Sequence, residues 1–362
     1  MNLEAAVIRG DGVGPEMMEE AVRVLEAVCR RFGHELKLYP VLACAQALEA
    51  GKEPLPKESL DICTGVPAVL FGNTGLKKYQ DRPIDERPEG ALMELRKALN
   101  VSTNIRPVRM YPSLKCFSPL KAERLENGMD VAFVRDIAGG VFCSEKVQGE
   151  GHGGREAYEY EYYNEEIVRK TAKTAFRLAE NRRGKVTNLD KSNVLGSSRL
   201  WRQTVNRAAG EFPQVNLEHL YIDNAAMELI RDPGRFDVFV TSNLFGDIIS
   251  DEGTELTGTP YLYPSAEISG TGQGIYTPNQ LHYPDESVIG KNLVNPIGMI
   301  AAAAQMLRLS FGLEAEAGAI EEGIRQVLAA NIATADIWHK GKILVGTKEM
   351  GKRISDEIEA VS

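Results

Sequence analysis

The sequence predicts an α/β protein built on a mixed, largely parallel sheet. Short apolar segments of strand length alternate with longer segments of helical periodicity along most of the 362 residues. The first strand is expected at Ala5–Ile8, a helix follows from about Pro15 to Phe32, and a second strand is expected at Leu36–Tyr39. Strands that alternate with helices favour parallel pairing, because each helix carries the chain back across the sheet. A chain of this length usually forms two domains.

The middle of the chain departs from this rhythm. After an apolar run at Val66–Phe71, short strands are expected at Val131–Val134 and Val141–Cys143, and Gly149–Gly154 is expected to form a glycine-rich turn. The stretch Tyr158–Tyr163 is rich in tyrosine and glutamate, which would be unusual as exposed surface in a lone domain. We therefore expect it to belong to an arm that packs on a partner subunit.

The alternation of strands and helices resumes at Asn164. Strands are expected at Lys185–Leu189 and Phe236–Val240. An alternating stretch from Val215 to Ile222 is typical of a strand that runs into a helix. The tail from Pro296 onward is predicted to be helical.

Composition excludes several classes of protein. The net charge of -9 and the absence of a long Lys/Arg run argue against a nucleic-acid or membrane-surface partner. The five cysteines are scattered and show no C-x-x-C spacing, so neither a disulfide framework nor a zinc site is indicated. There is no apolar stretch of membrane-spanning length, and because the N-terminus runs almost directly into a strand we expect no secretory leader. We expect a cytoplasmic protein.

The turn from Gly10 to Glu16 joins the first strand to the first helix. A dinucleotide fingerprint, Gly-x-Gly-x-x-Gly, would need glycine where this chain has Pro15. Proline suits the first position of a helix. We therefore expect a tight structural turn here, and no Rossmann fold.

Two aspartates point to a cation site. Asp247 and Asp251 are four residues apart, which places both carboxylates on one face of a helix. The pair alone fits a solvated helix face equally well, but Asp223 adds a third acid at the end of a predicted strand, where α/β proteins place their chemistry. Three carboxylates without a Cys or His ligand pattern suit Mg²⁺ or Mn²⁺ and argue against zinc.

Basic residues complement these acids. One arginine is normally a surface charge, but Arg96, Arg106 and Arg135 together fit a site that clamps two carboxylates through bidentate forks. Lys191 follows a predicted central strand and could act as a general acid or base if burial and a nearby cation lower its pKa. A loop lysine by itself is usually solvated.

Together these residues resemble the isocitrate/isopropylmalate (β-decarboxylating) dehydrogenase family, and most closely its isopropylmalate-type members. The similarity covers nearly the whole chain, and its motifs occur in the family's order. The most specific matches are Gly10–Glu16, Arg87–Gly90, Ser118–Lys121, Asp190–Val194, Tyr221–Asn224, Ser242–Asp251 and Pro264–Ala266.

The resemblance implies a two-domain isopropylmalate-dehydrogenase-like fold and a homodimer with shared active sites. Residues 1–101 and 258–362 would form the first domain, which holds both termini and the cofactor side. Residues 102–257 would form the second domain, with the dimerisation arm and the metal and substrate side.

The resemblance also implies roles for single residues, in the oxidation and β-decarboxylation of a small anionic 2-hydroxy acid. The carboxylates would be bound by Arg96, Arg106 and Arg135, and the substituent would face Leu92 and Met93. Mg²⁺ or Mn²⁺ would be held by Asp247 and Asp251 with Asp223 of the partner subunit. The catalytic residues would be Lys191 and Asp223. Lys191 of the partner subunit would relay the proton of the substrate hydroxyl. NAD would be bound by Glu89, Asp285 and Asn295.

The chain departs from the family pattern at the proton donor. Where the family has a tyrosine that protonates the enolate, this chain has Phe142. Phenylalanine keeps the ring and lacks the titratable O–H. Since general acid catalysis contributes roughly 10²–10⁴-fold, the reaction should be slowed unless water or another side chain substitutes.

The cofactor side departs as well. Leu281–Tyr283 replaces a Gly-Ser-Ala of the family, and bulky side chains obstruct the approach of backbone to an adenosine. Gly75–Gln80 also differs from the family's Gly-Gly-Pro-Lys-Trp-Asp, although Glu89 is retained. Asp285 could still accept a ribose hydroxyl, which favours NAD over NADP. These changes suggest altered or lost cofactor use.

Three hypotheses follow. The first is a metal-dependent, NAD-dependent dehydrogenase that acts on a substituted malate. The second is a regulatory or ligand-binding homologue without turnover, and the third is a β-keto acid decarboxylase that needs no nicotinamide. We place the dehydrogenase first because Lys191 and all three metal-binding acids are present.

Overall fold

The computed structural model describes residues 1–279 and 286–360, and the chain forms two compact units. Unit 1 comprises Met1–Val101, Tyr111–Phe117 and Gly258–Ser362, and unit 2 comprises Ser102–Met110 and Ser118–Thr257. The assignment of Tyr111–Phe117 to unit 1 was not predicted, because no feature of the sequence distinguishes this segment from its neighbours. Asp285 and the altered segment Leu281–Tyr283 lie outside the described residues.

The sheet of unit 1 is mixed. Strand β1 (Asn2–Ile8) lies between β2 (Glu35–Pro40) and β3 (Ala68–Phe71) and runs parallel to both. Strand β12 (Gly274–Pro278) continues the sheet parallel to β3, and β11 (Pro264–Ser269) pairs with β12 in the antiparallel sense. Every residue of β3 and β12 is buried, which explains the continuous apolar character of β3.

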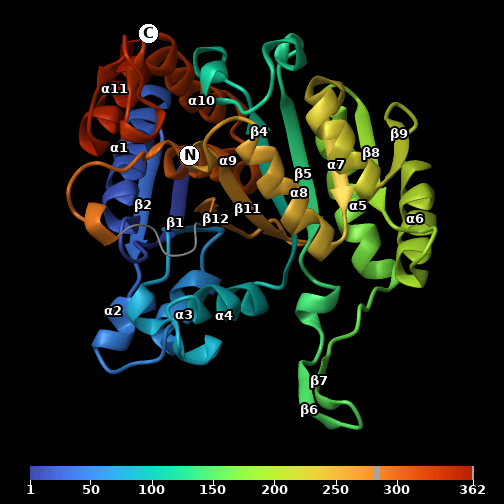
Figure 1. Ribbon diagram of the computed structural model, residues 1–362. Coiled ribbons are helices and arrows are strands. Elements are labelled where there is room, and N and C mark those ends of the chain that lie inside the picture. The colour runs from blue at the N-terminus through green and yellow to red at the C-terminus, as the bar shows by residue number, and fades with distance from the viewer. Residues whose placement is uncertain (280–285, 361–362) are drawn as a thin grey trace. The chain divides into compact units, whose positions relative to one another are not determined.

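The helices of unit 1 include a group drawn from both ends of the chain. Helix α1 (Gly14–Phe32) packs against α11 (Thr347–Ala360), and the two lie side by side in Figure 1. Helix α9 (Ile297–Phe311), with its Ala-rich run, is buried along most of its length. The remaining helices are α2 (Cys44–Glu49), α3 (Lys57–Thr64), α4 (Gly90–Ala98) and α10 (Glu314–Ala329), with a small pair of strands, β13 (Ile332–Ala333) and β14 (Ile343–Leu344). In the described part of the chain, no helix is both long and apolar enough to span a membrane.

In the main sheet, the strands of unit 2 pair in parallel, except for one. Strand β5 (Asp130–Asp136) pairs antiparallel with β4 (Val101–Arg109) and parallel with β10 (Val238–Thr241). Strands β8 (Lys185–Asp190) and β9 (Asn216–Tyr221) extend the parallel part in the order β10-β8-β9. The expected α/β fold with a mixed, largely parallel sheet is therefore confirmed.

Helices connect these strands and place the candidate residues at the carboxyl ends of the parallel strands. Helix α7 (Ile222–Arg231) follows β9 directly, and α8 (Asn243–Glu255) follows β10 after one residue. Helices α5 (Glu165–Glu180) and α6 (Gly196–Ala209) pack on each other beside the sheet. The core contains a cluster of Phe133, Phe236 and Phe239 with ring centroids 4.7–5.3 Å apart.

A hairpin projects from unit 2 (Figure 1). It consists of β6 (Val147–Gly151) and β7 (Gly154–Tyr158), joined by a two-residue turn within the predicted glycine-rich segment. Tyr158, Tyr160 and Tyr162 are more than half exposed.

The strand predicted at Val141–Cys143 is wrong, because this segment is a single 3₁₀ turn. Gly140 has a φ of 78°, which turns the chain out of the extended conformation just before the segment. The N–H of Cys143 then donates to the carbonyl of Gly140 at 3.1 Å, which closes the turn. Three apolar residues satisfied the strand pattern without having a neighbouring strand to pair with.

Candidate active site

One face of α8 carries the polar residues of the site. Asn243, Gly246, Asp247, Ser250 and Asp251 recur at helical spacing and therefore share a face. This face receives two arginines from the neighbouring strands. Arg135 comes from the end of β5 and Arg106 from the middle of β4.

Arg135 is buried and held on three of its donor positions. Its Nε and Nη2 atoms donate to Oδ1 of Asn243 at 3.0 and 2.7 Å, and Nη1 forms an ion pair with Asp247. Gly246 leaves room for the arginine stem, since a Cβ at this position would lie 2.6 Å from Cγ of Arg135. The buried charge is therefore compensated by a carboxylate and an amide oxygen.

Arg106 forms the second half of this cluster. Its Nη1 atom donates to Oδ1 of Asp251 at 2.8 Å and to Oγ of Ser250 at 2.9 Å, and Nη2 lies 4.0 Å from Oδ1 of Asp247. Among the described residues, its buried Nε atom has no hydrogen-bond partner. The side chains of Asp247 and Asp251 remain 40% and 64% exposed, so their carboxylates are accessible to a ligand. Two arginines and two aspartates make a nearly neutral, solvent-accessible cluster.

Lys191 and Asp223 form a separate pair in unit 2. Lys191 follows the last residue of β8, Asp223 lies in the first turn of α7, and Nζ of Lys191 lies 2.7 Å from Oδ1 of Asp223. The hydrogen bond from Lys191 lowers the pKa of the Asp223 carboxyl. The ammonium group also lies 5.7 Å from the centre of the Tyr221 ring. Within residues 1–279 and 286–360, no three acidic, histidine or cysteine side chains come together as a potential metal site.

The loop that carries Lys191 rests on a buried carboxylate. Asp190 is 1% exposed and accepts two bonds from Arg202, at 2.7 and 3.0 Å. Asp190 also accepts a hydrogen bond from the backbone N–H of Ser192, and this bond fixes the turn after β8. Asn188 donates to Asp190 from the same strand at 2.6 Å.

Arg96 in unit 1 already has an acidic partner. Its Nε donates to Oε2 of Glu267 at 2.7 Å, and Nη2 pairs with the other carboxylate oxygen. Glu267 lies on β11 and is buried. Of the two residues predicted to face a substituent, Leu92 is buried, whereas Met93 is exposed and its sulfur lies 3.6 Å from Nη1 of Arg96. Sequence reasoning missed Glu267, whose only signal is an acidic residue in an otherwise uncharged strand.

The residues predicted to bind the cofactor have contrasting environments. Oε2 of Glu89 is buried and has no hydrogen-bond partner among the described residues. Asn295 makes two hydrogen bonds within the fold, since Oδ1 accepts from the N–H of Ile297 and Nδ2 donates to Asp336, both at 3.0 Å. These bonds fix the start of α9.

A buried aspartate near Glu89 was not predicted. Asp11 accepts from the N–H of Ala45 and from Oγ1 of Thr74, at 2.9 and 2.8 Å. Burial raises the pKa of the Asp11 carboxyl, and the charge of Glu89 adds to the effect. The only sequence signal for Asp11 is its place in the turn that follows β1.

Phe142 is 47% exposed, and the guanidinium carbon of Arg135 lies 5.7 Å from the centre of its ring. The side chain therefore lies beside the α8 cluster without offering a proton. Tyr163 is the buried tyrosine of the arm, and its hydroxyl oxygen accepts from the N–H of Asn243 at 2.9 Å. Burial raises the pKa of Tyr163 well above its usual range, so this phenol holds its proton firmly.

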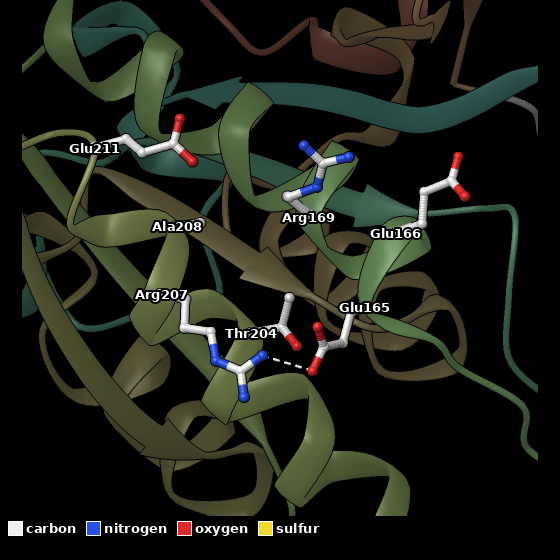
Figure 2. Close-up of a pocket in the computed structure, with 7 residues that line it drawn as sticks. All are labelled: Glu165, Glu166, Arg169, Thr204, Arg207, Ala208 and Glu211. Carbon is white, nitrogen blue, oxygen red and sulfur yellow. Dashed lines mark hydrogen bonds and ion pairs between the residues drawn. The ribbon is translucent and has the colours of Figure 1, made fainter.

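A cavity of about 300 Å³ lies between α5 and α6, and Figure 2 shows the side chains that line it. It is lined by Glu165, Glu166, Arg169, Thr204, Arg207, Ala208 and Glu211. Arg207 pairs with Glu165 across it, and Glu211 pairs with Lys173. None of the predicted site residues lines this cavity.

Comparisons with known proteins agree along the whole chain. Among curated proteins, the chain is 43% identical to the 3-isopropylmalate dehydrogenase of Oleidesulfovibrio alaskensis over 360 residues, covering 99% of this chain and 100% of that one. It is 44% identical to the 3-isopropylmalate dehydrogenase of Geobacillus kaustophilus over 358 residues, with 99% and 96% covered.

Solved structures show the same fold. An isocitrate dehydrogenase from Methylococcus capsulatus superposes with a TM-score of 0.84 at 27% identity, covering 99% of both chains. A β-decarboxylating dehydrogenase from Thermococcus kodakarensis, in its apo form, has a TM-score of 0.78 at 29% identity, with 99% and 96% covered. The family model described as isocitrate/isopropylmalate dehydrogenase matches residues 4–354, and the chain therefore belongs to this family.

Proposed function

We propose that this protein catalyses the metal-dependent oxidative decarboxylation of a substituted malate of the 3-isopropylmalate type, with NAD as the hydride acceptor. Membership of the family supports a β-decarboxylating dehydrogenase. The observation that carries the proposal is the α8 cluster, in which two arginines meet two accessible aspartates. Such a cluster offers both a carboxylate-binding and a cation-binding half.

The arginines of unit 2 would bind carboxylate groups of the substrate. Asp247 and Asp251 occupy part of the donor sets of Arg135 and Arg106. A substrate carboxylate can take the place of an aspartate at either guanidinium. The exchange would release the aspartates toward a cation.

The residues fit a hard divalent cation. Asp247 and Asp251 provide oxygen donors only, which suits Mg²⁺ or Mn²⁺, and Asp223 of the partner subunit would complete the set. The cation would supply Lewis acidity that stabilises negative charge on the oxygen atoms of the substrate. Lys191 of the partner subunit would take the proton of the substrate hydroxyl, for which its ammonium must first lose the proton held toward Asp223.

This sharing of residues between subunits requires a homodimer. Met227 and Ile230 on α7 and Ile248 on α8 are large apolar side chains that are exposed on unit 2. Exposed apolar groups together with the tyrosines of the hairpin arm are typical of a surface that a second copy covers. The dimer would bring Lys191 and Asp223 to the α8 cluster of the other copy.

NAD is the proposed oxidant. The buried Oε2 atom of Glu89 lacks a donor among the described residues, which fits a carboxylate that awaits a hydroxyl or amide of a ligand. Asp285 would accept from a ribose hydroxyl. The hydrogen bonds of Asn295 to Ile297 and Asp336 hold the start of α9, so we assign this residue a structural role before a role in binding NAD.

The substituent is proposed to be uncharged. Leu92 and Met93 would face it, and Arg96 is already neutralised by Glu267. An alkyl group fits these residues better than a third carboxylate would.

A ligand-binding homologue without turnover is the second candidate, and Phe142 favours it. The ring beside Arg135 offers no hydroxyl for protonation of an enolate. This candidate predicts that metal and substituted malate bind as well as in an enzyme, with no reduced nicotinamide formed.

One experiment separates these candidates. The purified protein is titrated calorimetrically with NAD and with NADP in the presence of Mn²⁺ and 3-isopropylmalate, and NADH formation is then followed by absorbance. Binding of NAD with NADH formation supports the dehydrogenase. Binding of the malate and metal without either nucleotide would overturn it in favour of the second candidate.

A further inference from the structure

Asn243, the first residue of α8, connects three parts of unit 2. Its Oδ1 atom accepts from Nε and Nη2 of Arg135, and its Nδ2 atom donates to the carbonyl of Gly139 at 2.8 Å. Its backbone N–H donates to the hydroxyl oxygen of Tyr163. Asn243 is 2% exposed, so water does not compete for these bonds.

We propose that Asn243 and Tyr163 are positioning residues that fix the direction of the Arg135 guanidinium. This inference rests on the proposed role of Arg135 in binding a carboxylate of the substrate. Neither residue touches the substrate in this proposal. Asn243 holds the guanidinium, and Tyr163 holds Asn243.

The chemistry of the side chain explains why an amide stands at position 243. The amide of Asn243 accepts from Arg135 through its oxygen and donates to the carbonyl of Gly139 through its nitrogen. An aspartate of the same shape would accept from Arg135 but would turn an oxygen toward the Gly139 carbonyl. It would also add a negative charge beside Asp247 and compete with an incoming carboxylate for Arg135.

Tyr163 supplies the cap that α8 lacks. The side chain of Ser242, at the N-cap, makes no capping hydrogen bond, so the first N–H of the helix needs another acceptor. The Tyr163 hydroxyl fills this role, and its ring packs edge-on against Trp201 at 5.2 Å. The cap therefore comes from a side chain that is itself fixed in the core.

The two glycines before Phe142 make room for this phenol. A Cβ at Gly139 would lie 2.6 Å from Cε1 of Tyr163, and a Cβ at Gly140 would lie 2.7 Å from its hydroxyl oxygen. The turn that leads to Phe142 is thus built around the Tyr163 ring. The ring, the turn and the start of α8 form one packed unit behind Arg135.

The proposal is tested with Asn243→Ala, Asn243→Asp and Tyr163→Phe in the full-length protein. The matched controls are Asn127→Ala and Tyr39→Phe, which change an exposed asparagine of unit 2 and a partly exposed tyrosine on β2 of unit 1. Calorimetry with 3-isopropylmalate and Mn²⁺ gives Kd, and steady-state kinetics give KM and kcat separately. Loss of a hydrogen bond to a charged group typically corresponds to a ~10–100-fold change in an equilibrium constant.

We expect Kd and KM to rise by about 10–100-fold in Asn243→Ala and at least as much in Asn243→Asp, with a smaller rise in Tyr163→Phe. The controls should keep the wild-type values. Asn243→Asp preserves the shape of the side chain and its acceptor, so it isolates the effect of an added negative charge from the loss of positioning in Asn243→Ala. Wild-type Kd and KM in a folded Asn243→Ala protein would overturn the proposal.

A second readout does not depend on the ligand. The Nε–H of Arg135 should give a ¹⁵N NMR signal that is protected from exchange with water, assigned by its loss in Arg135→Lys. We expect the protection to fall in Asn243→Ala and Tyr163→Phe and to persist in both controls. A wild type that fails to bind 3-isopropylmalate contradicts the proposed function alone, whereas unchanged protection in Asn243→Ala and Tyr163→Phe contradicts the positioning role.

Discussion

The guanidinium of Arg96 on α4 forms a two-point ion pair with the carboxylate of Glu267 on β11. The Glu267 side chain is 3% exposed, so its charge depends on Arg96 for compensation. Removing one partner of a buried pair costs about 3–5 kcal/mol, because the other charge is left uncompensated. Arg96 is partly exposed, which places the expected cost at the lower end of that range.

Arg96→Met should therefore lower the free energy of unfolding by about 3 kcal/mol. The double variant Arg96→Met with Glu267→Leu should recover most of this loss, since no unpaired charge remains. Urea unfolding provides the measurement, with Lys352→Ala as a control that breaks an exposed pair with Asp356 and should cost less than about 1 kcal/mol. A double variant as unstable as Arg96→Met would contradict the pairing argument.

The aspartates of α8 are expected to control metal affinity. Asp247→Asn and Asp251→Asn each remove one anionic oxygen donor and should weaken Mn²⁺ binding at least about tenfold, since affinity follows the charge of the ligand set. Glu255→Gln, on an exposed position of the same helix, is the matched control. Calorimetric titration with Mn²⁺ measures the affinities. Wild-type affinity in both aspartate variants would place the metal elsewhere.

Much of this site could be predicted because it depends on local spacing. The four-residue spacing of Asp247 and Asp251 follows from the helical period, and the place of Lys191 follows from the strand that ends at Asp190. Helix–strand alternation likewise predicted the fold. These features need only the residues a few positions away.

The partners of these residues could not be predicted, because they lie far away in the sequence. Glu267 is 171 positions from Arg96, and Tyr163 is 80 positions from Asn243. Such pairs depend on which strands become neighbours, and no local pattern encodes that order. The 3₁₀ turn at Val141–Cys143 was missed for a related reason, since a buried ring from another segment shapes the backbone there.

Phe142→Tyr tests whether the missing hydroxyl limits the reaction. A restored phenol beside Arg135 could protonate an enolate, and general acid catalysis contributes roughly 10²–10⁴-fold. We expect kcat to rise within that range while KM changes little, as measured by NADH absorbance. Phe142→Leu serves as the control without a ring or a hydroxyl. No gain in a protein that binds NAD would show that another group or water already donates the proton.

Asp136 is expected to make stability depend on pH. Its side chain is fully buried and accepts from the N–H of Gly139 at 2.8 Å and from Oγ1 of Thr171 at 3.3 Å. Burial raises the pKa of this carboxyl from 3.8 to about 6. The folded state therefore holds the proton more firmly than the unfolded state. The resulting stabilisation is complete below pH 3.8 and is lost as the pH rises through 6.

Asp136→Asn removes this dependence, because the amide is neutral at every pH and can still accept from Gly139. A shift of this size corresponds to about 3 kcal/mol in full, so the variant should gain about 2 kcal/mol relative to the wild type between pH 4 and pH 7. Urea unfolding followed by tryptophan fluorescence at both pH values gives the difference, and Trp201 reports from the same unit. If the two proteins differ by the same free energy at both values, Asp136 does not titrate in this range. The turn at Gly139 would then be held by a carboxylate that stays charged.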